Sequence, residues 1–149
     1  DTGEMTHARQ VIRDEICARL ADIADVTVVN SRAYPIVTLP SISVYTLTES
    51  SVSENVTINA PRRYSRTLAV SISIAVREID QGDEMADVYA AQVEQRMAAD
   101  VTLGGLVTDS TLTQTDTDID GSTEKPTYIM RMVYEIWYRT TADNPGAVI

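Results

Sequence analysis

The stretch from Leu68 to Arg77 restricts the fold more than any other part of the chain. Apolar side chains alternate there with small or polar ones: Leu68, Val70, Ile72, Ile74 and Val76 against Ala69, Ser71, Ser73, Ala75 and Arg77. A period of two predicts a β-strand, because successive side chains of a strand point to opposite faces of its sheet. We therefore expect one face of this strand in the core and the other small and mildly polar.

The segment 127–140 alternates in the same way but carries large side chains on both faces. One face holds Tyr128, Met130, Met132, Tyr134, Ile136 and Tyr138, and the other holds Ile129, Arg131, Val133, Glu135, Trp137 and Arg139. Such a strand is typical of a central position or of a subunit contact. A preceding strand is predicted over 106–120, and Asp120-Gly121 indicates a hairpin turn that ends at Pro126.

Two segments have helical periodicity instead. Residues 6–24 repeat apolar side chains at steps of three and four (Ala8, Ile12, Ile16, Leu20 and Ile23), with Thr6 as the expected N-cap. Residues 80–100 have an apolar stripe of Ala86, Tyr89, Ala90, Val93 and Met97, with Asp80 or Asp83 as the expected cap. Both stripes predict amphipathic helices that cover a sheet.

The remaining segments are less regular. A short strand is predicted over 25–31, and one or two strands over 35–50, interrupted at Pro35 and Pro40. Residues 50–63 are rich in Ser and Asn and predict a long loop, which could contain a loose hairpin around Val56 to Ile58. A short tail over 141–149 ends in aliphatic residues.

The fold class that follows is α+β. We expect two helices packed on a largely antiparallel mixed β-sheet, in a single domain over residues 1–149. No unbroken apolar run approaches the length that spans a bilayer, so we expect no membrane segment.

The charge of the chain limits its partners. A net charge of -10 argues against a basic groove that grips nucleic acid, because phosphate binding depends on Lys and Arg. The same charge suits a surface past which DNA moves without sticking, because a negative wall repels a polyanion.

The glycine pair Gly104-Gly105 raises the question of a phosphate-binding loop. Such a loop needs a strand before it, a Gly-Lys-Ser/Thr ending and a helix after it. Here a predicted helix precedes the glycines, a predicted strand follows, and no Lys is present. We interpret the pair as a helix C-terminus in which glycine adopts the left-handed conformation.

The segment 116–121, Asp-Thr-Asp-Ile-Asp-Gly, matches the first half of an EF-hand calcium loop at Asp116, Asp118, Asp120 and Gly121. The position that needs a bidentate Glu is Thr127, and strands rather than helices flank the loop. A solvated acidic hairpin is the simpler interpretation, and a small calcium-responsive binding module remains an alternative of a different class.

Candidate catalytic groups are few. His7 and Cys17 are the only histidine and cysteine, and their spacing along one predicted helix separates them by about 15 Å. They cannot act as base and nucleophile within one chain, and a lone cysteine forms no internal disulfide. No carboxylate stands in a context that would raise its pKa. We expect no enzyme, no cofactor and no metal site.

The candidate interface residues follow from charge and hydrophobicity. Arg62, Arg63 and Arg66 form a basic cluster that could meet a partner's acidic rim or a passing phosphate backbone, or could simply offset neighbouring acidic groups. The predicted long loop, the tail and the aromatic last strand add the remaining candidates: Val56, Trp137, Val148 and Ile149.

One family pattern runs through residues 85–140. An alanine-rich helix leads into Asp100-x-Thr102-Leu103-Gly104-Gly105-Leu106-Val107, followed by an acid- and threonine-rich strand, a Lys125-Pro126 turn and a closing strand that ends Tyr138-Arg139-Thr140. This arrangement resembles the C-terminal half of the tail terminator proteins of long-tailed bacteriophages, the family that includes the minor tail protein U of lambda. The first half of the chain is similar in plan only.

The resemblance implies an α+β fold and a structural role in the virion. Members of the family form a homo-hexameric ring that caps the tail tube, stops its polymerisation and meets the head-completion or connector proteins. By this resemblance, the protein would be assembled in the host cytoplasm, would lie in the tail-neck region, and would let genomic DNA pass through the ring. Another neck or connector ring protein is the alternative of the same class.

Overall fold

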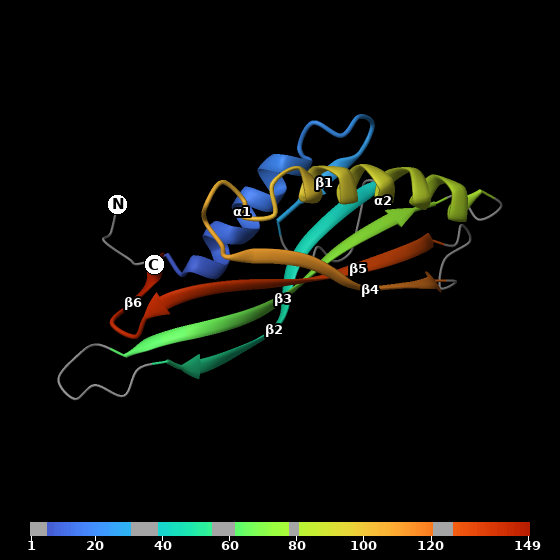
Figure 1. Ribbon diagram of the computed structural model, residues 1–149. Helices are drawn as coiled ribbons and strands as arrows, with labels where there is room; N and C mark the ends of the chain where they lie inside the picture. Colours follow the sequence, from blue (N-terminus) through green and yellow to red (C-terminus); the bar gives the residue numbers. More distant parts are fainter. Residues whose placement is uncertain (1–5, 31–38, 55–61, 78–80, 121–126) are drawn as a thin grey trace.

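The computed structural model of the chain describes residues 6–30, 39–54, 62–77, 81–120 and 127–149. These residues form two helices and six strands in one α+β domain (Figure 1). In chain order the elements are α1 (Ala8–Leu20), β1 (Thr27–Val29), β2 (Ser41–Ser53), β3 (Arg63–Val76), α2 (Gly82–Ala99), β4 (Asp109–Asp120), β5 (Thr127–Thr141) and β6 (Asn144–Val148). The predicted fold class is confirmed.

The strands form one mixed sheet in the order β1-β2-β3-β5-β4. Only β1 and β2 pair in parallel, and the other neighbours are antiparallel. The centre is the β3–β5 pair, whose register runs without interruption from Arg63↔Thr141 to Val76↔Tyr128. The central position predicted for the last strand is therefore confirmed, with β3 on one side and β4 on the other.

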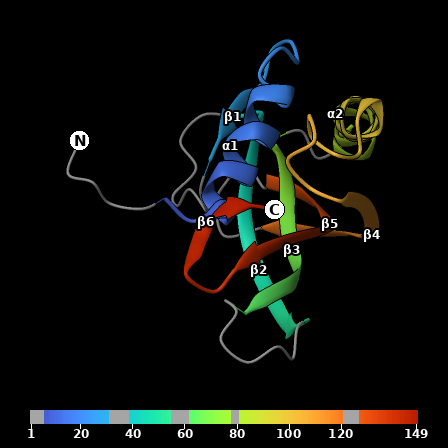
Figure 2. The same cartoon turned by 60° about the vertical axis from the view of Figure 1, so that its left-hand side comes forward.

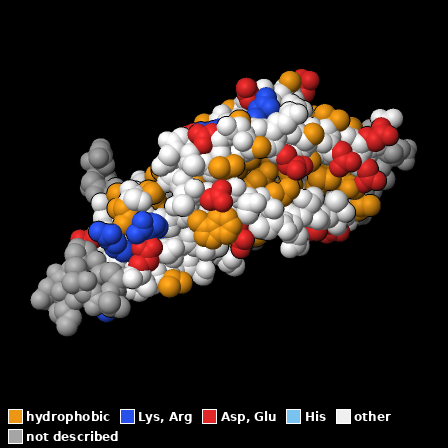
Figure 3. All heavy atoms as spheres, in the orientation of Figure 1, with side chains coloured by type: hydrophobic (Ala, Val, Ile, Leu, Met, Phe, Trp, Pro, Cys, Tyr) orange, Lys and Arg blue, Asp and Glu red, His pale blue; other side chains and the backbone are white. Residues whose placement is uncertain are grey.

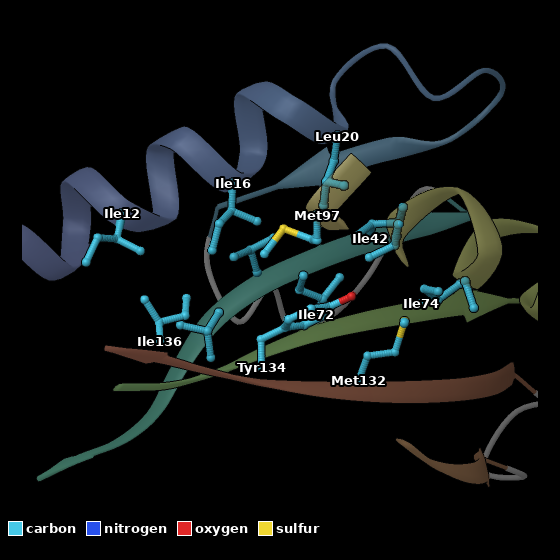
Figure 4. Close-up of a cluster of buried hydrophobic side chains, with 14 of the residues drawn as sticks. Ile12, Ile16, Leu20, Ile42, Ile72, Ile74, Met97, Met132, Tyr134 and Ile136 are labelled. Atoms are coloured by element: carbon cyan, nitrogen blue, oxygen red, sulfur yellow. The ribbon is translucent and has the colours of Figure 1, made fainter. Parts of the chain in front are cut away.

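Both helices cover the same face of the sheet (Figures 1 and 2). The predicted stripes face inward: Ile12, Ile16 and Leu20 of α1 and Met97 of α2 point towards the sheet (Figure 4). They meet the core faces of three strands, which carry Ile42, Val44, Leu68, Val70, Ile72, Ile74, Met132, Tyr134 and Ile136. At about 25 cal/mol per Å² of apolar surface, this burial is the main stabilising contribution to the fold.

The helix ends differ from the predicted ones. The N-cap of α1 is His7, not Thr6, and its side-chain Nδ1 accepts a hydrogen bond of 3.1 Å from the backbone N–H of Arg9. The N-cap of α2 is Gln81, which makes no side-chain cap bond, and Asp83 lies inside the first turn. There its negative charge interacts favourably with the helix dipole, but its side chain does not cap the helix. Asp80 lies outside the described residues.

The predicted loop over 50–63 begins too early, and the strand predicted from Leu68 begins too late. β2 continues to Ser53 and β3 begins at Arg63, and the two strands stay paired to Ser53↔Tyr64. The arm, residues 47–53 of β2 and 63–67 of β3, extends beyond the helices (Figure 1), and β5 stays paired with its β3 part up to Arg63↔Thr141. Residues 55–61, with Val56, Ile58 and Pro61, lie outside the described part of the chain, as do Pro35, Gly121 and Pro126.

Each of two strands contains one β-bulge that changes which residues face the core. In β2 the register shifts between Thr46 and Thr48, so that Ile42, Val44 and then Glu49 share the core side. In β4 the shift falls between Leu112 and Gln114. A bulge inserts one residue and so reverses the facing of every residue after it.

The tail predicted over 141–149 is a strand. After a tight turn, β6 folds back against β5 with Thr140↔Val148 paired, and the N–H of Ile149 donates to the carbonyl of Arg139 at 2.9 Å. β4 pairs with β5 only as far as Trp137. β6 therefore covers the part of the β5 edge that β4 leaves open, and it also contacts α1.

Candidate functional site

The glycine pair does not form the C-terminus of α2, which ends at Ala99 with Asp100 in an extended conformation; it lies in the turn over 101–107 that follows, in the predicted left-handed conformation. Gly104 and Gly105 have φ values of 75° and 86°, and Leu103 before them has 52°. The carboxylate of Asp100 accepts from the Thr102 N–H at 3.0 Å and from the Gly104 N–H at 2.9 Å. Side-chain and backbone hydrogen bonds from Thr102 and Gly104 lower the pKa of Asp100. Two amides that could have faced a phosphate thus donate to a carboxylate of the same turn.

The predicted acidic hairpin is described only up to Asp120, and that part belongs to strand β4. Asp116 and Asp118 lie in β4 opposite Arg131 and Ile129, on the face of the sheet that the helices leave open. Asp116 lies 3.6 Å from Arg131. The described residues contain no group of three or more side chains placed to hold a metal ion. An extended strand cannot wrap its carboxylates around one cation as an EF-hand loop does.

His7 and Cys17 have separate surroundings. His7 caps α1, and burial together with the positive charges of Arg9 and Arg66 lowers its pKa. Cys17 is half-buried on α1, and burial, with a contribution from Asp14, raises its pKa from 9.0 to about 11. A thiol that is almost wholly protonated near neutral pH is a weak nucleophile.

The basic cluster is divided between the interior and the surface. Arg66 is buried: its Nη1 lies 3.0 Å from Oε1 of Glu49, its Nε donates to Thr140 at 2.9 Å, and its guanidinium stacks 5.3 Å from the ring centre of Tyr64. Arg66 thus offsets an internal acidic group, one of the two roles considered for the cluster. Arg62 and Arg63 are exposed at the end of the arm.

Glu49 is the centre of a buried polar network that the sequence did not reveal. Its side chain is 8% exposed and accepts from Arg9 at 2.6 Å, from Arg66, and from the hydroxyl of Tyr138. Burial alone would raise the pKa of Glu49, but the hydrogen bonds of Tyr138, Arg66 and Arg9 outweigh it and lower the pKa. The only signal in the sequence was a carboxylate within a strand, and the bulge that turns it inward has no sequence signature.

Trp137 lies half-buried on the open face of the sheet. Its neighbours in register are Thr67 on β3 and Asp109 on β4, and its carbonyl accepts from the Thr108 N–H at 2.7 Å. Small residues of β3, among them Ser71 and Ala75, lie on the same face. The face is thus neither core nor strongly polar, and the interface role of Trp137 stays a prediction.

The two terminal candidates lie close to the basic end of the arm. Val148 in β6 packs partly against the core, whereas Ile149 is 52% exposed. The Ala142 N–H donates to the carbonyl of Arg62 at 2.7 Å, so the turn into β6 and the start of β3 are adjacent. The structure thus brings Arg62, Arg63 and Ile149 to one end of the molecule (Figure 1). Val56 lies outside the described residues.

Comparisons with known proteins add no assignment. No family model matches the chain, and no curated protein sequence is significantly similar to it. The family resemblance rests on the pattern of residues 85–140. Among the described residues, no helix is both long enough and apolar enough to cross a bilayer.

Proposed function

We propose that this protein is a tail terminator of a long-tailed bacteriophage. In this role six copies form a ring on the finished tail tube, stop its polymerisation and provide the surface on which head and tail join. The partners are further copies of the chain, the tail tube protein and a head-completion or connector protein. Genomic DNA passes through the ring without specific binding, and the protein resides in the tail-neck region of the virion after assembly in the host cytoplasm.

The arm formed by β2 and β3 is the observation that carries the proposal. Its strands keep their pairing to Ser53↔Tyr64, yet most of the outer residues of β2 are exposed. Val52 is 64% exposed on the arm, and Leu47 at its base is 40% exposed. An ordered edge strand with apolar side chains in water is typical of a surface that becomes covered on assembly.

The charge and the fold of the resembling segment agree with this role. Residues 85–140 form the body of α2, the glycine turn, β4 and β5, which is the order that the family pattern implies. A chain of net charge -10 suits the wall of a channel for DNA, because it repels the phosphate backbone. His7, Asp100 and Glu49 are engaged in a helix cap, a turn and the buried polar network, respectively.

Native mass spectrometry and negative-stain imaging of the purified protein test the proposal. We expect a species of six subunits, seen as a ring whose central hole is at least about 20 Å wide, the width of duplex DNA. The variant Val52→Asp should lose the ring and keep the stability of the subunit to within about 0.5 kcal/mol, because the side chain is exposed.

Val101→Asp is the matched control, since Val101 is 41% exposed but lies in the turn after α2 and not on β2. It should leave the ring intact. A protein that stays monomeric at high concentration, or a ring that Val52→Asp leaves unchanged, would contradict the proposal.

A further inference from the structure

The charge of the chain is concentrated at one end of the molecule. Residues 77–126 contain twelve of its acidic residues and only three basic ones, which accounts for nine of the ten net negative charges. In Figure 3 the acidic side chains spread mainly along α2 and over the end where β3 and β4 finish, whereas basic side chains gather beside the arm.

The arm end is locally positive. Arg62 and Arg63 are exposed there, and Arg139 lies beside them in an ion pair of 2.8 Å with Glu54. Among the described residues, Asp143, in the turn before β6, is a second acidic residue at this end. Because Glu54 and Asp143 together carry less charge than the three arginines, the arm end keeps a positive balance.

The opposite end is acidic and carries apolar side chains. The first turns of α2 expose Glu84 and Asp87, and the end of β4 exposes Asp118. Val88 on α2 is 59% exposed and Ile119 on β4 is 55% exposed. We call this surface the acidic end; it consists of Glu84, Asp87, Val88, Asp118 and Ile119.

The two ends cannot meet within one subunit. β3 runs from Arg63 at the arm to Val76 beside the start of α2, and at 3.2–3.4 Å per residue the strand separates them by roughly 40 Å. A contact between the arm and the acidic end therefore requires a second copy of the chain.

We infer that the arm of one subunit docks on the acidic end of the next, with Arg62 and Arg63 facing Asp87 and Asp118. This inference rests on the proposed ring and names its two mating surfaces. Val52 and Leu47 of the arm would lie against Val88 and Ile119, so that an apolar centre is framed by opposite charges. Such a layout is typical of protein interfaces.

The separation of charge also limits which surfaces can pair. Two arms, or two acidic ends, repel each other, so a contact of arm with arm or of acidic end with acidic end is disfavoured. In the proposed ring the arm of each copy meets the acidic end of the next, which is a heterologous contact. The number of subunits in the assembly, six for a ring and two for a reciprocal dimer, distinguishes the two arrangements that this contact allows.

Charge reversal at each end tests the contact. The arm variant is Arg62→Glu/Arg63→Glu, and the acidic-end variant is Asp87→Lys/Asp118→Lys. All four side chains are exposed, so the subunits should still fold, which a thermal melt checks. Each variant alone should lose the ring at concentrations at which the wild type is fully assembled, with the half-assembly concentration raised about a hundredfold or more.

Mixing the two variants gives the decisive result. An arm that is now negative can dock only on an acidic end that is now positive, and the two wild-type surfaces that remain also match. The equimolar mixture should therefore form rings in which the two variants alternate, three copies of each, identified by native mass spectrometry. A general loss of folding could not be repaired in this way.

Glu94→Lys/Asp109→Lys is the matched control, because it changes one exposed acid on α2 and one on β4 by the same charge, away from the acidic end. It should leave the ring intact.

Rings that survive both reversals, or a mixture that stays dissociated, would overturn the contact and leave the ring itself standing. A wild type that forms no oligomer would overturn the proposed function as well. Retention of the wild type on duplex DNA that the arm variant abolishes, with no change in assembly, would show that the arginines serve DNA and would overturn the contact.

Discussion

Arg9 in the first turn of α1 and Glu49 in β2 form an ion pair of 2.6 Å that joins the start of the chain to the base of the arm. Arg66 approaches the same carboxylate oxygen at 3.0 Å, and the hydroxyl of Tyr138 donates to the other. One buried carboxylate thus connects α1, β2, β3 and β5 at the point where the sheet leaves the cover of the helices. The network therefore ties α1 to three strands at the base of the arm.

The variant Glu49→Gln should lower the free energy of unfolding by about 3 kcal/mol, because it leaves the buried guanidinium of Arg66 without its counter-charge. Arg9→Gln should cost about 1 kcal/mol or less, since the Arg9 side chain is 35% exposed and water can replace its contact. Urea unfolding followed by circular dichroism measures both. Equal effects of the two substitutions would mean that the network is not organised around the buried Arg66–Glu49 pair.

The same carboxylate predicts an acid limb in the stability profile. The pKa of Glu49 is lowered in the folded chain, so the unfolded state binds the proton more readily. Stability from this group is fully present above the unfolded pKa of about 4.3 and is lost as the pH falls through the folded value. Between pH 5 and pH 3, roughly, Glu49→Gln should lose less stability than the wild type does. Parallel curves would show that other carboxylates control the acid limb.

Regular periodicity predicted the helices and the two central strands, and irregular features escaped prediction. The apolar stripes of α1 and α2 and the alternation of β3 and β5 appear as expected. The arm was missed because its Ser- and Thr-rich sequence resembles a loop, while its order comes from hydrogen bonds between strands that local composition does not encode. Glu49 was missed because the bulge after Thr46 reverses its facing. The interface candidates could not be derived from local patterns, because an interface forms between two copies of the chain.

The glycine turn predicts a substitution pattern specific to backbone conformation. Gly104 has φ of 75° and only the Arg19 guanidinium, at 3.7 Å, near the place of a Cβ. Gly104→Ala should therefore cost about 1 kcal/mol through the left-handed conformation and not through a clash. Gly104→Asn should cost less, because asparagine tolerates this conformation. Millimolar inorganic phosphate should not raise the melting temperature of the wild type. A rise that Gly104→Ala abolishes would favour an anion site.

Cys17 provides a single probe of the packing of α1. Its pKa of about 11, compared with an ordinary 9.0, implies about a hundredfold less thiolate near pH 8 than in the unfolded chain. Iodoacetamide should therefore modify the native protein at least about a hundred times more slowly than the urea-unfolded protein, as measured by the mass of the intact chain over time. A native rate within tenfold of the unfolded rate would mean that α1 opens readily from the sheet.

Removal of β6 tests whether the C-terminal tail stabilises its own subunit or serves as an interface between subunits. Truncation after Asp143 removes the pairing at Thr140↔Val148 and the bond from Ile149 to Arg139, and it exposes apolar surface that Val148 covers. Two hydrogen bonds and one partly buried valine together predict a loss of about 2 kcal/mol in the free energy of unfolding of the subunit. Removal of Ile149 alone, which is 52% exposed, should cost less than about 1 kcal/mol. If truncation after Asp143 leaves subunit stability unchanged and weakens only assembly, the tail acts between subunits and not within one.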